Sequence, residues 1–276
     1  MFSVKRSSFS RRIMTVSHKI TWQLGVRFPK TFPFVFVIGF PKSGTTWACQ
    51  LVAAYLQLPY PRVPLFPLGF ASAVHGHELV SKKYPYCVYV IRDGRDAMVS
   101  LFFHIQKMIL QGNSLGFRRN QQEIFLTGDD PAQVRKNFSR FLEIQIKRPI
   151  GSRYSWAEHV MSSQEIEHPK LARLKYEELI TDGAAALARE MSLLDGDAPN
   201  IERAQFFIND FSFSRSAAKS KKTEDKGMFL RKGVSGDWKN YFTREAADIF
   251  DHHCGTALIA TGYEQDRQWL DALPAE

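Results

Sequence analysis

A lysine, a serine and two threonines lie in a short glycine-bearing segment, Gly39-Phe40-Pro41-Lys42-Ser43-Gly44-Thr45-Thr46. An apolar run from Phe34 to Ile38 precedes it, and a helical apolar pattern follows from Trp47 to Leu56. Converging backbone N–H groups in such a loop, together with the positive end of a helix dipole, bind anions. The segment therefore predicts a phosphate site between a buried strand and a helix. An ordinary strand–turn–helix is the alternative.

The residues after the second glycine limit the class of ligand that the loop is expected to bind. The spacing Gly39-x-x-x-x-Gly44 is that of a nucleotide-triphosphate loop, in which Lys follows the second glycine and Ser or Thr then holds magnesium. Here Thr45 and Thr46 occupy those positions, and the lysine stands earlier, as Lys42. We therefore expect a phosphate-bearing ligand that is bound without the usual Mg-ATP geometry.

A second anion-binding pair, Arg92 and Ser100, follows the apolar run Cys87 to Ile91, which is typical of a buried strand. Ligands of an open parallel sheet meet the carboxyl ends of its strands, so we expect Arg92 to project into the same crevice as Lys42. Ser100 lies about two helical turns further on, in a predicted helix from Ala97 to Gln111. The two side chains could bind a second phosphate, whereas a surface charge cluster is the alternative.

A third basic site is predicted at Arg231 and Lys232, directly before Gly233. Two adjacent cations before a glycine can hold a phosphate through side chains and backbone N–H groups together. A solvated basic turn is the alternative.

Two histidines, His75 and His77, lie upstream of the strand that carries Arg92. A neutral imidazole can accept a proton from an alcohol or phenol near neutral pH. We choose His75 as the candidate base, with His77 as the alternative and Glu78 as the third choice, although a lone histidine is more often structural than catalytic.

Three segments together resemble the sulfotransferases that use 3′-phosphoadenosine-5′-phosphosulfate (PAPS). Pro41-Lys42-Ser43-Gly44-Thr45-Thr46-Trp47 resembles, letter for letter, their 5′-phosphosulfate loop, and Val90 to Ser100 resembles their 3′-phosphate segment. The run from Arg231 to Thr243 matches the Arg-Lys-Gly-x-x-Gly-Asp-Trp-Lys-x-x-Phe-Thr segment that closes over PAPS in the cytosolic-type enzymes. The resemblance covers about Phe34 to Tyr263.

The resemblance implies transfer of a sulfuryl group from PAPS to an acceptor hydroxyl or amine, with His75 and Lys42 as catalytic residues and no metal. In the family the base is a histidine in a Lys-Thr-His-like segment. Ala73-Val74-His75 aligns with it but lacks the lysine and the threonine. The implied PAPS-binding residues are Lys42, Ser43, Gly44, Thr45, Thr46 and Trp47 in the loop, Arg92, Ser100, Arg231, Lys232 and Gly233 at the 3′-phosphate, and Tyr176, Ser212 and Phe213, with Trp47, at adenine.

The elements that must position these residues predict an α/β fold. We expect a single domain with a central parallel sheet flanked by helices and a P-loop-like phosphosulfate-binding loop, spanning residues 31–270 after a basic, flexible segment at 1–30. A third strand is predicted from Leu171, running into a helix by Leu179. Further helices are predicted over Pro131 to Ile146, from Ser155, over Thr181 to Leu194, over Asn200 to Asn209 and after Thr243.

The composition of the chain is consistent with a protein that binds PAPS. Lys and Arg number 37 against 28 Asp and Glu, a net charge of +9 that fits a polyanionic ligand such as PAPS. Three scattered cysteines form neither a metal-ligand spacing nor an even disulfide set, which favours a reducing, cytoplasmic location. The basic, acid-free first 30 residues also suit an organelle transit peptide or a contact with a membrane surface.

Two other functions remain open at this level. A small-molecule kinase would need magnesium and no 3′-phosphate, and a non-catalytic module would only bind phosphorylated ligands or nucleic acid. The acceptor is also open among phenols, steroids, lipid alcohols and sugars, because its pocket is expected in Leu115 to Arg153, which carries no readable substrate code. No motif in the chain indicates an oligomeric state.

Overall fold

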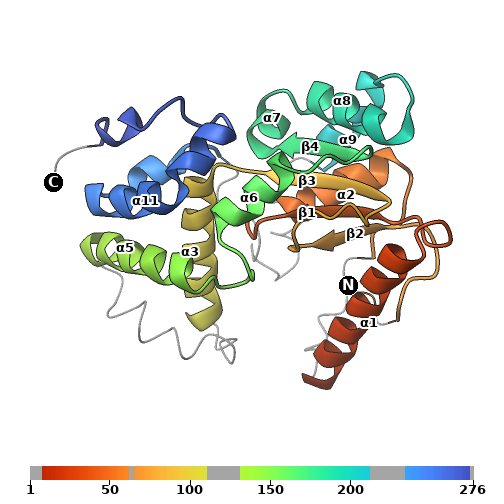
Figure 1. The fold of residues 1–276 in the computed structure, drawn as a ribbon, viewed down its shortest axis with the longest axis horizontal. Helices are drawn as coiled ribbons and strands as arrows, with labels where there is room; N and C mark the ends of the chain where they lie inside the picture. The colour runs from red at the N-terminus through yellow and green to blue at the C-terminus, as the bar shows by residue number, and fades with distance from the viewer. Residues whose placement is uncertain (1–7, 62–63, 65, 111–130, 212–233, 274–276) are drawn as a thin grey trace. The chain divides into compact units, whose positions relative to one another are not determined.

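The computed structural model describes residues 8–61, 64, 66–110, 131–211 and 234–273 (Figure 1). The chain divides into two compact units, each built from separate stretches. The first comprises the described residues of Met1–Ile38, Thr45–Val90 and Ile166–Phe211, and the second those of Gly39–Gly44, Ile91–Glu165 and Ser212–Glu276.

The first unit is an α/β structure around a four-stranded sheet with the order β2-β1-β3-β4. Its elements are α1 (Ser8–Arg27), β1 (Val35–Gly39), α2 (Thr45–Tyr55), β2 (Ala73–Gly76), β3 (Tyr86–Ile91), β4 (Leu171–Lys175), α7 (Tyr176–Thr181), α8 (Gly183–Asp195) and α9 (Ile201–Asp210). The α/β fold with a central parallel sheet flanked by helices is thus confirmed.

Strands β1 and β3 coincide with the apolar runs that predicted them, and β4 begins at Leu171, where the third strand was predicted. Strand β2 was not predicted, because it has only four residues, contains His75 and ends at a glycine. It pairs in parallel with β1, and the register places His75 opposite Val37. The prediction therefore missed that the candidate base lies within the sheet.

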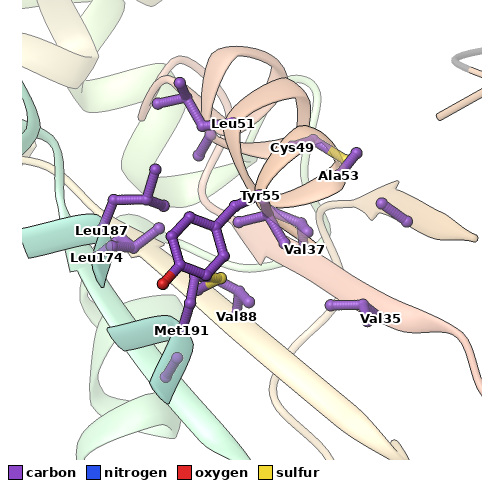
Figure 2. Packing of buried hydrophobic residues seen from close by; sticks show 14 of the residues in the cluster. Val35, Val37, Cys49, Leu51, Ala53, Tyr55, Val88, Leu174, Leu187 and Met191 are labelled. Atoms are coloured by element: carbon purple, nitrogen blue, oxygen red, sulfur yellow. The ribbon is translucent and has the colours of Figure 1, made fainter. Parts of the chain in front are cut away.

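One face of the sheet packs against α2 and α8 (Figure 2). Alternate residues of the strands, including Val37, Val88 and Leu174, meet apolar side chains such as Leu187 and Met191 in one buried cluster. Burial of this much apolar surface is the main force that holds strands and helices together. Strand β1 is held in this cluster through Val35 and Val37, and the loop that follows it in the chain carries Lys42.

The other face of β1 packs against α1. Trp22 of this helix meets the ring of Phe36 edge-on, with 4.6 Å between ring centroids, and Phe36 stacks on Tyr84 at 4.5 Å. Gly25 lies so close to the strand that an added Cβ would come within 2.6 Å of Phe34. Helix α1 is therefore part of the first unit's packing.

This helix differs from the flexible segment predicted for residues 1–30. Its buried positions are Met14, Ser17, Thr21 and Gly25, which recur at helical spacing. Three of these four side chains are small or polar, so the sequence shows no apolar stripe on the buried face. Thr21 further accepts a hydrogen bond from Leu68 N–H at 3.0 Å.

The second unit is built mainly from helices: α3 (Gly94–Leu110), α5 (Pro131–Lys147), α6 (Trp156–Gln164), η1 (Asp237–Asn240), α11 (Arg244–Ala260) and η2 (Gln268–Leu270). Helix α11 packs against α3, α5 and α6. Ser155 caps α6 in a reciprocal capping box with Glu158, and Thr243 caps α11, as their positions predicted. Among the described residues, no helix combines the length and apolarity that a membrane crossing requires.

Candidate functional site

The loop between β1 and α2 has a backbone suited to anions. Lys42 adopts φ 72° and Gly44 φ 84°, both in the left-handed region. The alternation of hand along such a loop turns successive N–H groups toward one side. A non-glycine residue in this region costs about 1–3 kcal/mol, and such residues cluster at functional sites. The strained residue here is the lysine singled out from the sequence.

Two hydroxyl groups of the loop fit a phosphate. The Ser43 Oγ and Thr45 Oγ1 atoms are buried and have no hydrogen-bond partner among the described residues. A buried hydroxyl without a hydrogen-bond partner destabilises the folded chain, and a hydrogen bond to a ligand oxygen would remove that cost. The residues therefore fit a phosphate-type anion, although their roles in binding one remain predictions.

Burial, together with the nearby charges of Arg92 and Lys107, lowers the pKa of the Lys42 ammonium to about 8. Lys42, Arg92 and Lys107 are three cations close together in a partly buried place, which indicates a binding site for an anion. The loop thus offers a lysine whose charge would be strongly stabilised by an incoming phosphate.

Arg92 lies beside this loop, as its position after β3 predicted. Its Nη1 donates to the carbonyl oxygen of Lys42 and its Nη2 to that of Val234, each at 3.2 Å. The guanidinium therefore connects the loop to Val234. This residue directly follows Gly233, the last residue of the third predicted basic site. Ser100, the other predicted phosphate ligand of this segment, lies half-buried on α3.

Asp96 is a structural partner of the site that the sequence reasoning missed. Its carboxylate is fully buried and accepts hydrogen bonds from Gly236 N–H at 2.7 Å and Trp238 N–H at 2.9 Å. It also faces Arg92 at 4.0 Å, one helical turn away. The i, i+4 spacing of these opposite charges was the available signal. Asp96 thereby fixes the chain directly after residue 233.

Trp156, on α6, contacts the backbone of Arg92. Its Nε1 donates to the carbonyl oxygen of Arg92 at 3.2 Å, and its ring packs 5.9 Å from that of Phe250. Gly94 makes this approach feasible, because a Cβ there would come within 2.5 Å of Trp156. Trp156 thus positions the backbone of Arg92.

In the first unit, Trp47 and Tyr176 lie together. Their ring centroids are 5.9 Å apart at an interplanar angle of 75°. Trp47 Nε1 donates to the carbonyl oxygen of Phe211 at 2.9 Å, which fixes the indole on α2. Two of the three aromatic residues predicted to hold adenine are therefore neighbours.

His75 and His77 are also neighbours in this unit. Both are half-buried, and their rings lie 4.8 Å apart at an angle of 84°. His75 is held by strand β2, whereas His77 follows its end. The geometry leaves both histidines as candidates for the base.

Five predicted PAPS-binding residues lie outside the described residues: Ser212, Phe213, Arg231, Lys232 and Gly233. Their roles stay predictions from the sequence. Residues 115–130 of the predicted acceptor-binding stretch, Leu115 to Arg153, also lie outside the described residues.

Comparison with known proteins identifies the family. The model of the family described as "Sulfotransferase domain" matches residues 74–262. The chain therefore belongs to the sulfotransferase family, and the prediction of a cytosolic-type, PAPS-dependent sulfotransferase is confirmed at the level of the family.

Curated relatives agree with this assignment. The chain is 27% identical to a 3-beta-hydroxysteroid sulfotransferase of Cavia porcellus, over 78% of this chain and 79% of the relative. It is 23% identical to an amine sulfotransferase of Oryctolagus cuniculus, over 79% of this chain and 78% of the relative.

Solved structures share the fold. A mouse sulfotransferase complexed with PAP superposes with a TM-score of 0.60 at 19% identity, covering 84% of this chain and 88% of that one. A retinol dehydratase in complex with retinol and PAP gives a TM-score of 0.55 at 20% identity, covering 82% and 81%.

Proposed function

We propose that the chain transfers the sulfuryl group of PAPS to a hydroxyl or amine of a small-molecule acceptor. The observation that carries the proposal is the loop at Lys42, with its left-handed backbone and the unpartnered hydroxyls of Ser43 and Thr45 among the described residues. Relatives named for amines and hydroxysteroids, and related folds complexed with PAP, the adenosine 3′,5′-bisphosphate left after transfer, support the class of reaction.

The reaction is an in-line displacement at sulfur. The acceptor oxygen or nitrogen forms a new bond to sulfur while the bond from sulfur to the 5′-phosphate oxygen breaks. Negative charge grows on that leaving oxygen. Lys42 and the loop N–H groups are suited to stabilise it, an effect that typically changes rates by about 100- to 1000-fold per donor. The products are the sulfated acceptor and PAP.

His75 is proposed as the base that takes the acceptor proton. Strand β2 holds its backbone in register with β1, the strand that runs directly into the phosphate loop. A residue anchored in the sheet keeps a fixed position during the reaction, whereas His77 lies beyond the strand end. This difference favours His75 over His77.

Specificity for PAPS over ATP is proposed to come from the 3′-phosphate. Arg92 and Ser100, with Arg231, Lys232 and Gly233, would hold it, and the Trp47 and Tyr176 rings, with Ser212 and Phe213, would hold adenine. The contact of Trp47 with Tyr176 and the placement of Arg92 beside Lys42 support these two groupings separately. The scheme calls for no metal.

A cytoplasmic location is proposed to accompany this function. Cys49, Cys87 and Cys254 are all buried free thiols. Burial raises the pKa of each, to about 12 for Cys254, so none is a reactive thiolate at neutral pH. Such cysteines suit a reducing compartment.

The decisive experiment combines turnover and binding. Sulfuryl transfer from radiolabelled PAPS is measured over a panel of phenols, hydroxysteroids and amines, for the wild type and for Lys42→Ala. We expect a loss of about 100-fold or more in turnover for the variant. Calorimetry should show tighter binding of PAP than of adenosine 5′-phosphate. Equal affinities would contradict the role of the 3′-phosphate. Magnesium-dependent ATP turnover, or binding of PAP with no turnover of PAPS on any acceptor, would favour the kinase or the non-catalytic module.

The base is tested with His75→Ala and His77→Ala. Removing a general base typically slows a reaction by about 100- to 10,000-fold, so we expect that loss for His75→Ala alone. The control is His252→Ala, because His252 and His253 form a similar edge-on pair on α11, with ring centroids 4.6 Å apart. A normal rate for His75→Ala would reject its assignment as the base.

A further inference from the structure

The net positive charge of the chain comes from one end of the sequence. Nine of the 37 Lys and Arg residues, and none of the 28 Asp and Glu residues, precede Glu78. The remaining 28 cations therefore balance the 28 acids, and the whole net charge of +9 comes from the first 77 residues. Seven of these nine cations lie within the first 30 residues, in and around α1. Such asymmetry indicates a polyanionic partner for this region.

Helix α1 also exposes apolar side chains that its packing leaves free. Ile13, Val16 and Ile20 are 39%, 56% and 43% exposed, and their spacing places them on one face of the helix. The opposite side holds Trp22 and Gly25 against the aromatic face of β1. The helix therefore cannot turn its exposed apolar face inward without giving up that packing.

Cations accompany the apolar face. Arg12, Lys19 and Arg27 are exposed on the same helix, which carries no acid. Long basic side chains can keep their charge in a polar layer while their stems lie along apolar surface. Glu78 lies near His18 of the helix, but within the helix itself the exposed apolar residues are accompanied by cations and by no acid. This is the pattern of a helix that lies in the interface of a membrane.

Neighbouring residues extend the exposed apolar surface of this region. Phe28, directly after α1, is 55% exposed. Phe66 and Phe70 are 79% and 55% exposed and flank Leu68, whose N–H is bonded to Thr21 of α1. Half of the large apolar residues that are exposed in the described part of the chain thus lie on α1 or close to its contacts.

We propose that α1 and the adjoining phenylalanines dock the chain on a membrane surface that contains anionic phospholipids. Each feature has a counterpart there: the isoleucines, valine and phenylalanines enter the apolar boundary, and the arginines and lysine meet the headgroup charges. Nucleic acid would match the charge but not the apolar residues. A cleaved transit peptide would match the composition, but its removal would take away the contacts of Trp22 and Gly25 in the first unit.

The test is sedimentation of the full chain with vesicles of phosphatidylcholine, with and without phosphatidylserine, in the absence of PAPS. Wild-type protein is expected to pellet only with the anionic vesicles, and less as salt rises. Neutralising one cation at the surface should weaken binding about 5-fold, so Arg12→Gln with Lys19→Gln should lose roughly 30-fold. Val16→Ser with Ile20→Ser should lose about 10-fold, because two apolar side chains no longer enter the lipid.

Matched controls separate docking from folding and from net charge. Arg140→Gln with Lys147→Gln removes two exposed cations of helix α5, and Leu193→Ser with Ile201→Ser removes two exposed apolar groups of α8 and α9, so none of these residues belongs to α1. Both controls should bind vesicles like the wild type. All four double variants should keep wild-type melting and turnover of a water-soluble acceptor, so a failure of the proposed reaction would appear separately. Absence of wild-type binding to anionic vesicles, equal loss in the controls, or import and cleavage of the chain by isolated organelles would overturn the proposal.

Discussion

The guanidinium of Arg92 donates a hydrogen bond to the carbonyl oxygen of Lys42 at 3.2 Å. Its second nitrogen reaches the carbonyl oxygen of Val234, also at 3.2 Å. One planar side chain therefore holds the main chain of the loop between β1 and α2 and the main chain that follows residue 233. The same arginine is proposed to contact the 3′-phosphate, so it organises the binding segments as well as supplying charge.

The first prediction concerns the two hydrogen bonds that the Arg92 guanidinium donates. Arg92→Lys keeps the charge but cannot bridge two carbonyl oxygens in a fixed geometry. We expect the free energy of unfolding of the unliganded protein to fall by about 2 kcal/mol, since bonds from charged donors each contribute about 1.5–3 kcal/mol. Chemical denaturation measures the change, and Arg140→Lys, at an exposed arginine, serves as the control. Unchanged stability in Arg92→Lys would mean that only its charge matters.

The second prediction concerns pH. The pKa of Lys42 is lowered to about 8 in the free protein, and a bound phosphate should raise it again. Above the free pKa, binding must take up a proton, so affinity for PAP should fall by up to about tenfold for each further pH unit. Calorimetry in buffers of different ionisation enthalpy would measure both the affinity and the proton uptake. Lys42→Ala should lack this dependence, and a flat profile for the wild type would contradict the prediction.

In the unliganded protein, Lys42 should make the free energy of unfolding rise with pH, whereas the affinity for PAP should fall. The folded chain loses the Lys42 proton near pH 8, whereas the ordinary value in the unfolded chain is 10.5. Between these values the unfolded state binds more protons, so the contribution of Lys42 to stability rises with pH over that window. A comparison of pH-dependent unfolding between the wild type and Lys42→Ala isolates this contribution.

The third prediction concerns the strained backbone at Lys42, where φ is 72°. Lys42→Gly and Lys42→Ala both remove the ammonium, but only glycine adopts this conformation without strain. We expect Lys42→Gly to be more stable than Lys42→Ala by about 1 kcal/mol, while both lose turnover. At Gln50, inside helix α2, the order should reverse, because glycine costs about 1 kcal/mol relative to alanine there. Equal stability of the two Lys42 variants would argue against strain.

The fourth prediction concerns Gly94. A methyl group there would come within 2.5 Å of Trp156 and 2.8 Å of Phe250, and it would disturb the bond from Trp156 to the carbonyl oxygen of Arg92. Gly94→Ala should lower the free energy of unfolding by about 1–3 kcal/mol. It should also weaken PAP binding. Gly69→Ala, where an added Cβ would meet no atom within 4 Å, is the control and should be neutral.

The sequence predicted well those parts whose signal is local. The strand–loop–helix from Val35 to Tyr55, strands β3 and β4, and the caps at Ser155 and Thr243 depend on neighbouring residues, and the structure contains each of them. The phosphate-binding role of the loop stays a prediction. The proximity of Arg92 to the loop followed from a general rule for parallel sheets.

Features that depend on tertiary packing were missed. Strand β2 is too short to show a pattern, and α1 buries Ser17, Thr21 and Gly25, which carry no apolar periodicity. The hydrogen bonds of Asp96 to Gly236 and Trp238 join positions about 140 residues apart, and no local rule gives such a partner. The left-handed backbone at Lys42 also has no signature in the residue type, because lysine rarely adopts it.

The burial of all three cysteines has a practical consequence. Because Cys49, Cys87 and Cys254 are buried, the native chain should react slowly with maleimide reagents. A single cysteine introduced at Val16, which is 56% exposed, would then carry a fluorophore as the main label without removal of the native thiols. The emission of an environment-sensitive dye at that position would report directly how deeply the helix enters a lipid bilayer.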